Sequence, residues 1–245
     1  MNRSILLAVL VVLVFAVILV ARLPASWVLS GPRSDLHCVD TAGTIWDGSC
    51  SGMTVKGQAI GDLSWEVHAG RLLAGKFAAS AVLTRGTGSA RGTVELGFGG
   101  QLNGHDIHID LPLDPTLVPQ LPSNLRGSVH ADLASIQMRQ NAITAVQGQI
   151  EARDLQLGVG ASAEPFGSYS LTFSPATGPL VGQLGDLGGP LQVEGTVRLT
   201  PEPGYDLQGV VKPRANAPEA LVRELQFLGS PDAQGRRPFA AAGTF

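Results

Sequence analysis

The chain has 245 residues and a formal net charge of −3, from 17 basic and 20 acidic side chains. Charged residues make up 15% of the sequence and the basic ones do not cluster, so nothing predicts nucleic-acid binding, which needs a concentrated cationic surface. No stretch is polar enough to predict long disorder, and the length past residue 22 suffices for one sizeable domain or two small ones.

An unbroken apolar run extends from Ile5 to Ala21, with Arg3 before it and Arg22 after it. A membrane-spanning helix needs roughly 17–25 apolar residues, and this run reaches the lower end of that range. The sequence therefore predicts a single transmembrane anchor, residues 1–22, followed by a large domain, residues 23–245, on one side of a membrane.

A cleaved signal peptide is the alternative interpretation of this run. The apolar part of a signal peptide is usually about 7–15 residues long and precedes a small-x-small cleavage site. The present run is longer, and cleavage after Ala21 would leave Leu19 where a small residue is needed, so an uncleaved anchor is favoured. Arg3 on one side and Arg22 and Arg33 on the other give a weak charge bias. The short N-terminal tail favours an inside N-terminus and an exported domain.

Cys38 and Cys50 are the two cysteines of the chain. In an oxidising compartment such a pair is a natural disulfide, because free exported thiols are uncommon. Turn signals at Ala42-Gly43 and Asp47-Gly48 predict three short strands, which would put the cysteines on strands separated by a third. Since neighbouring strands lie about 4.8 Å apart, the predicted bond then needs a bend or bulge.

Between Leu36 and Val211 the dominant hydrophobic period is two, as in Leu63–Val67, His105–Leu111 and Leu191–Leu199. This alternation is typical of strands with one buried face, so the domain is predicted to be mainly antiparallel β. A short pattern recurs along these segments: a glycine, a small or polar residue, then valine or isoleucine. Its irregular spacing indicates a glycine-rich, strongly curved meander and not a fixed-period solenoid. The copies begin at Gly92, Gly127, Gly148, Gly195 and, in degenerate form, Gly209.

Two places break the β pattern. Prolines in Asp114–Pro122 exclude a central strand, so a connector is predicted near residues 112–124. Residues Ala217–Gly229 predict one short C-terminal helix, with Pro218 at its first position and Leu221, Leu225 and Leu228 along one side. The tail Pro238–Phe245 is compatible with one last strand.

A search for reactive residues predicts no catalytic, cofactor-binding or metal site. Gly48–Gly52 superficially matches a nucleophile elbow, but a strand-like segment follows where a helix is required. Asp106, His108 and Asp110 would share one strand face, as a metal site would need, but a polar solvent-facing surface explains this pattern fully and no other His or Cys cluster supplies further ligands. Trp46 and Trp65 are interpreted as core residues, with an interface role as the alternative.

Several boxes of this sequence resemble those of the type II secretion system protein N family. Their order along the chain, after a single N-terminal anchor, carries the resemblance. The cysteine pair is a departure that is not a hallmark of the family. The boxes are Gly43–Gly48, Leu63–Trp65 with Leu72–Gly75, Gly189–Gly195, Tyr205–Gly209, Lys212–Arg214, Leu225–Asp232 and Gly235–Phe239.

The resemblance implies a bitopic, single-pass protein of the cell inner membrane whose periplasmic β domain forms the bulk of the chain. It implies a non-catalytic accessory or assembly role in protein secretion, in the machinery that exports folded proteins across the outer membrane. The implied partners are other inner-membrane components of that machine. The sequence is also similar to AsmA-like proteins, whose curved sheets can present an apolar trough to lipid, so the alternative is periplasmic binding or transfer of a lipid or another hydrophobe. A periplasmic hydrolase is disfavoured, because no nucleophile has a base in a suitable setting.

Overall fold

The computed structural model describes residues 3–29, 35–72, 75–97, 99–113, 122–140, 142–158, 163–175, 178–200 and 204–244. The helices in these ranges are α1 (Arg3–Ala21), α2 (Ser26–Leu29), α3 (Ala69–Leu72) and α4 (Glu219–Leu225). The strands are β1 (Leu36–His37), β2 (Asp40–Gly43), β3 (Asp47–Val55), β4 (Gln58–Val67), β5 (Phe77–Arg85), β6 (Gly88–Leu96), β7 (Gln101–Pro112), β8 (Leu125–Arg139), β9 (Ala142–Leu157), β10 (Glu164–Phe173), β11 (Val181–Gly188), β12 (Leu191–Thr200), β13 (Gly204–Pro213) and β14 (Arg237–Thr244).

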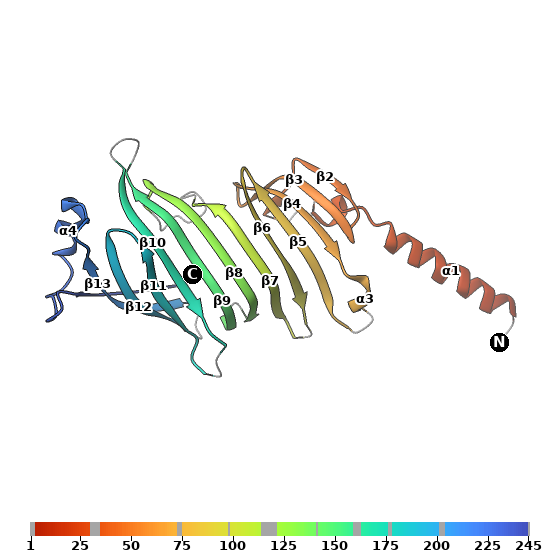
Figure 1. The fold of residues 1–245 in the computed structure, drawn as a ribbon. Coiled ribbons are helices and arrows are strands. Elements are labelled where there is room, and N and C mark those ends of the chain that lie inside the picture. Colours follow the sequence, from red (N-terminus) through yellow and green to blue (C-terminus); the bar gives the residue numbers. More distant parts are fainter. Residues whose placement is uncertain are drawn as a thin grey trace.

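All these strands belong to one antiparallel sheet, which confirms the predicted mainly β fold. From β3 to β14 each strand pairs with the next one in the sequence, while β1 and β2 both pair with β3. The long curved sheet has α1 beyond one end and α4 at the opposite end (Figure 1). The predicted connector, residues 112–124, falls mostly on positions 114–121, which lie outside the described residues.

The alternation of the sequence becomes two adjacent rows of residues that cross the sheet. Residues paired across neighbouring strands share a face, and successive residues along a strand face opposite sides. We call the side of the first row the apolar face and the side of the second row the polar face. The apolar row is Cys50, Leu63, Leu83, Ala90, Ile109, Ala131, Ile150, Leu171, Leu184, Gly195, Gly209 and Phe239. The polar row is Ser49, Ser64, Val82, Arg91, His108, Asp132, Gln149, Thr172, Gln183, Thr196, Gln208 and Ala240.

Curvature lets the apolar face pack against itself. Phe173 on β10 is buried in a cluster with Leu133 and Val146, and Leu199 packs against that cluster from β12, two strands along the sheet. At the C-terminal end, Leu225 of α4 covers a second cluster of buried strand residues, Leu191, Val193 and Val211. The core is therefore spread along one side of the sheet.

Gly148 permits one of the irregularities that bend the strands. Its φ is +140°, and an added Cβ would overlap the carbonyl oxygen of Asp132 and approach the Cα of Leu133 to 2.6 Å. The β8–β9 register shifts between Leu133 and Ser135, next to this glycine. Both the conformation and the close approach of β8 require glycine here.

The first helix carries apolar side chains that the rest of the chain leaves largely exposed. Those described between Leu7 and Val20 are exposed to between 46% and 68%. Within the residues that the structure describes, no helix combines the length and the hydropathy that crossing a membrane requires.

The predicted C-terminal helix is present but shorter than expected. It runs from Glu219 to Leu225, and Pro218 is its N-cap and not its first residue. Backbone N–H groups of the next three residues, up to Leu228, bond to carbonyls three positions earlier, which is a 3₁₀-type tightening. The sequence predicts one helix beyond α1, but the structure has two further short helices there, α2 and α3. The tail forms β14, which starts at Arg237.

In the structure a disulfide joins Cys38 and Cys50, whose Cα atoms lie 5.5 Å apart. The expectation that a third strand separates the two cysteines is wrong. Cys38 lies between β1 and β2, both of which pair with β3, and Cys50 belongs to β3. The N–H of Val39 also donates to the carbonyl of Ser51, so the two segments are direct neighbours.

Replacing both Cys38 and Cys50 by serine should lower the free energy of unfolding by on the order of 2–3 kcal/mol, because the bond closes a short loop in the unfolded chain. Protein purified without reductant should show no free thiol on quantitative labelling under denaturing conditions. Two reactive thiols per chain would contradict the bond.

Candidate functional site

The most distinctive local structure is the turn that joins β2 to β3, which coincides with the Gly43–Gly48 box. Thr44 organises this turn, because its Oγ1 accepts hydrogen bonds from the backbone N–H groups of Trp46 and Asp47, each at 3.2 Å. The N–H of Thr44 donates to the carbonyl of Asp47 at 2.7 Å. Gly43 adopts a φ of +83°, which favours glycine. The box therefore encodes a compact, rigid turn.

Hydrogen bonds attach this turn to the end of α1 and the residues that follow it. The indole N–H of Trp46 donates to the carbonyl of Val20 at 2.9 Å, in the last turn of α1, and this carbonyl also accepts a hydrogen bond from the N–H of Leu23 at 3.3 Å. The N–H of Ile45 donates to the carbonyl of Leu23 at 3.0 Å, and the N–H of Ala25 donates to the carbonyl of Gly43 at 3.3 Å. We call this set of contacts the junction. It fixes the exit of α1 against the first strands of the sheet.

Trp46 and Trp65 both donate hydrogen bonds at the junction. The indole N–H of Trp65 donates to the carbonyl of Ile45 at 3.2 Å from the neighbouring strand β4. Trp46 is half-buried against α1 and not inside the sheet, so its interpretation as a core residue is wrong. The contact between Trp46 and Val20 spans 26 residues of sequence, so no local pattern reveals it.

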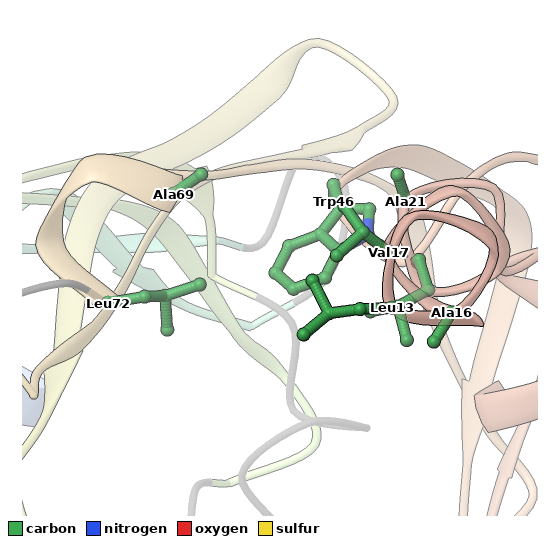
Figure 2. A pocket seen from close by; sticks show the side chains of 8 residues that line it. Leu13, Ala16, Val17, Ala21, Trp46, Ala69 and Leu72 are labelled. Atoms are coloured by element: carbon green, nitrogen blue, oxygen red, sulfur yellow. Dashed lines mark hydrogen bonds between the residues drawn. The ribbon is translucent and has the colours of Figure 1, made fainter. Parts of the chain in front are cut away.

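An apolar pocket of about 490 Å³ opens beside the junction. Figure 2 shows the indole of Trp46 between α1 on one side and the segment carrying Ala69 and Leu72 on the other. The residues that line the pocket are apolar: Leu13, Ala16, Val17, Val20, Ala21, Trp46, Ala69 and Leu72. It offers no acid, base or nucleophile, so it suits binding of apolar groups and not catalysis.

Polar contacts hold α3, which carries two of the lining residues, on the sheet. Arg71 of α3 forms an ion pair with Glu95 of β6, and Glu95 is only 6% exposed. His68, just before α3, lies 2.8 Å from the hydroxyl of Ser80, which in turn lies 3.2 Å from that of Thr93. These contacts on the polar face fix the position of α3 relative to β5 and β6.

A second polar cluster lies at the other end of the sheet, where two family boxes meet. Arg214 donates to the carboxylate of Asp186 at 2.7 Å and to the carbonyls of Gly189 and Leu191 at 3.0 Å each. Burial would raise the pKa of Asp186, but the hydrogen bonds from Arg214 and the N–H of Val193 outweigh it and hold that pKa below its usual value. The cluster ties β11 to β12 and to the residue that follows β13.

Tyr169 of β10 belongs to the same region. Burial and the negative charge of Asp186 raise the pKa of the Tyr169 hydroxyl to about 12, although the charge of Arg214 opposes the shift. The hydroxyl donates to the carbonyl of Phe166 at 2.6 Å. A phenol held protonated in a structural hydrogen bond is no candidate base, so this cluster stabilises the sheet.

Replacing Asp186 by asparagine should lower the melting temperature at pH 7. A depressed carboxyl pKa contributes stability above the unfolded value of about 3.9 and loses it as pH falls through the folded value. The difference in melting temperature between the two proteins should therefore shrink below about pH 4. Thermal unfolding followed by circular dichroism across this range measures it, and a difference independent of pH would contradict the role of the charge.

The other sequence candidates do not form a reactive site. Asp106 lies at a β-bulge with a φ of +50°, outside the regular alternation of β7. The ring of His108 lies 2.5 Å from Asp132, and that of His130 lies 3.4 Å from Asp110, as cross-strand pairs. In the described part of the chain no group of three potential metal ligands gathers. Gly48–Gly52 lies within β3, and β4 follows it, so the elbow interpretation fails.

The Gly43–Gly48 box and the boxes of the C-terminal cluster both lie in the part of the chain that matches a known protein family. The family described as "Type II secretion system (T2SS), protein N" matches residues 35–240. The type II secretion system protein N of Aeromonas hydrophila is 26% identical over 253 residues, covering 99% of both chains. That of Vibrio cholerae is 29% identical over 233 residues, covering 91% of this chain and 92% of the relative. No solved structure matches. This chain therefore belongs to the type II secretion system protein N family.

Proposed function

We propose that the protein is a non-catalytic accessory and assembly component of the type II secretion machinery. In this proposal α1 anchors it in the inner membrane and the sheet lies in the periplasm, in contact with other inner-membrane components of the machine. The junction carries the proposal. A sheet fixed to the end of its anchor by the Trp46–Val20, Ile45–Leu23 and Ala25–Gly43 hydrogen bonds presents its surfaces in a set direction from the membrane, as a scaffold requires.

The surface of α1 supports its role as an anchor. A helix that is apolar all round needs an apolar environment, and the rest of this chain does not supply one. Its 19 residues extend about 28 Å at 1.5 Å per residue, close to the hydrocarbon thickness of about 30 Å. A slightly short span is accommodated by local thinning of the bilayer and by flanking side chains that reach the interface.

The proposed topology predicts that a reporter active only in the periplasm, fused after Phe245, is active. The reason is the uncleaved anchor with an inside N-terminus that the apolar run favours. Alkaline phosphatase activity in whole cells measures the location, and N-terminal sequencing of the mature protein tests cleavage. A mature chain that begins at Arg22 or later would rule out the anchor.

The scaffold role is tested by deleting the gene and restoring it on a plasmid. Secretion of folded exoproteins should fall, or neighbouring machine components should become unstable, while outer-membrane lipid composition stays unchanged. Restoring the intact gene should reverse the loss. Normal secretion after deletion would contradict the proposed scaffold role.

A second candidate function is binding or transfer of a lipid or another hydrophobe, and the apolar row across the sheet favours it. The row continues from Leu63 near α1 to Phe239 on the last strand, and parts of the apolar face, such as Phe77 and Leu96, remain exposed. Protein purified in mild detergent and extracted with organic solvent should then contain stoichiometric phospholipid. A lipid-transport defect with normal secretion would replace the scaffold role with this one.

A further inference from the structure

We infer that the turn between β4 and β5 is a second membrane contact, which enters the outer leaflet beside α1 and takes phospholipid acyl chains into the junction pocket. The inference rests on the proposed anchoring of α1. It concerns the described residues of this turn, His68–Leu72 and Gly75–Phe77, including α3.

The turn between β4 and β5 lies beside α1. Ala69 and Leu72 line the pocket together with Leu13 and Val17 of α1 (Figure 2). Val17 lies about one helical turn, and Leu13 about two turns, before the end of α1. Leu13 precedes Ala21 by about 12 Å along the helix axis at 1.5 Å per residue. The turn therefore lies alongside the C-terminal part of α1 and not beyond its end. If α1 crosses the bilayer, these side chains lie at the depth of the acyl chains.

The turn presents exposed apolar side chains next to an apolar pocket. Leu72 is 37% exposed and Phe77 is 40% exposed, and every residue lining the pocket is apolar. A water molecule in such a space would lose hydrogen bonds, so its transfer from bulk water is unfavourable. An acyl chain loses none and buries apolar surface there, so its transfer is favourable. The ion pair of Arg71 with Glu95 holds the turn in place, so the apolar surface is present before any lipid binds.

Basic side chains near the pocket favour a phospholipid over an uncharged ligand. Arg22 directly follows α1 and Lys76 follows the apolar residues of the turn. Both are exposed, whereas the guanidinium of Arg71 is paired with Glu95. The N–H of Lys76 donates to the carbonyl of Arg71 at 3.1 Å, which closes the turn and brings these two residues together. Long basic side chains beside an apolar surface place their charges at the level of lipid phosphates. The occupant is therefore a phospholipid, with its phosphate among the cations and its chains in the pocket.

The test measures the immersion of a spin label in the full-length protein, reconstituted into vesicles of phosphatidylethanolamine and phosphatidylglycerol. Because Cys38 and Cys50 are bonded to each other, a single introduced cysteine takes the label. Labels are attached in three separate variants, Leu72→Cys, Leu13→Cys and Val82→Cys. Val82 is the matched control, since it is an apolar residue with 40% exposure on β5. Collision with oxygen reports lipid, and collision with a water-soluble nickel chelate reports water.

The label at position 72 should collide more often with oxygen than with the nickel chelate, as the label at position 13 does, and the label at position 82 should show the opposite order. No other protein is present, so immersion at position 72 reports lipid alone. A water-accessible label at position 72 with an immersed label at position 13 would overturn the second contact and leave the anchor standing. Water access at positions 13 and 72 together would overturn the anchor as well.

Discussion

Replacing Gly148 by alanine should destabilise the protein by on the order of 4 kcal/mol, the largest effect that we expect from any single methyl group. A φ of +140° costs a residue with a Cβ about 1–3 kcal/mol, and overpacking typically adds about 1–3 kcal/mol. The added methyl group would meet the carbonyl oxygen of Asp132 and the backbone of Leu133, neither of which can rotate away. Urea unfolding followed by circular dichroism measures the loss.

Gly178 offers a matched control for this substitution. Its φ is +146°, nearly that of Gly148, but an added Cβ there would find no atom within 4 Å. Gly178→Ala should therefore show only the conformational part of the cost, about 1–3 kcal/mol. Equal losses at the two positions would mean that the close approach of β8 contributes nothing.

Replacing Trp46 by alanine should reduce secretion of exoproteins severalfold while the protein stays in the membrane. The change removes the hydrogen bond to Val20 and the largest side chain between α1 and the sheet. Loss of a partly buried tryptophan costs on the order of 2–3 kcal/mol, somewhat less than in a full core, and here that energy holds the sheet against α1. Exoprotein activity in the culture medium, normalised to the amount of membrane-bound protein, measures the effect.

Three controls separate orientation from general damage. Trp27 is 74% exposed, so Trp27→Ala should leave secretion almost unchanged. Trp46→Phe keeps a ring but loses the N–H, and should give an intermediate result. An unrelated span in place of residues 4–19 should retain most activity, because Val20 contributes its backbone carbonyl to the junction. Full secretion by Trp46→Ala would show that the junction is dispensable.

The sheet could be predicted because its signal is local. In Leu191–Leu199 alternate side chains take opposite faces whichever strand lies beside them, so the sequence indicates the strand without its neighbours. The helix near Leu221 was predictable from its start signals and leucine spacing. Its end was not, because Gln226 to Leu228 continue the helical pattern while tightening into a 3₁₀-type turn.

The junction and the C-terminal cluster could not be predicted, because their contacts join distant parts of the chain. Trp46 lies in an alternating segment, which favours a core position, and only the folded chain brings Val20 to its indole. Asp186 likewise lacks a local signal, since its partner Arg214 is 28 residues away. The cysteines were misplaced for a related reason: β1 and β2 share one side of β3, an arrangement that turn signals do not encode.

The order of the strands also bears on how the protein is made. From β3 onward each strand pairs with the strand that precedes it in the sequence, so almost every contact in the sheet joins consecutive elements. A chain that emerges from its N-terminus can add each new strand to a partner that is already in place, without waiting for distant residues. Local pairing of this kind favours rapid folding and shortens the time that an unpaired edge is open to aggregation. The sheet can thus grow outward from α1 at the pace of its own synthesis.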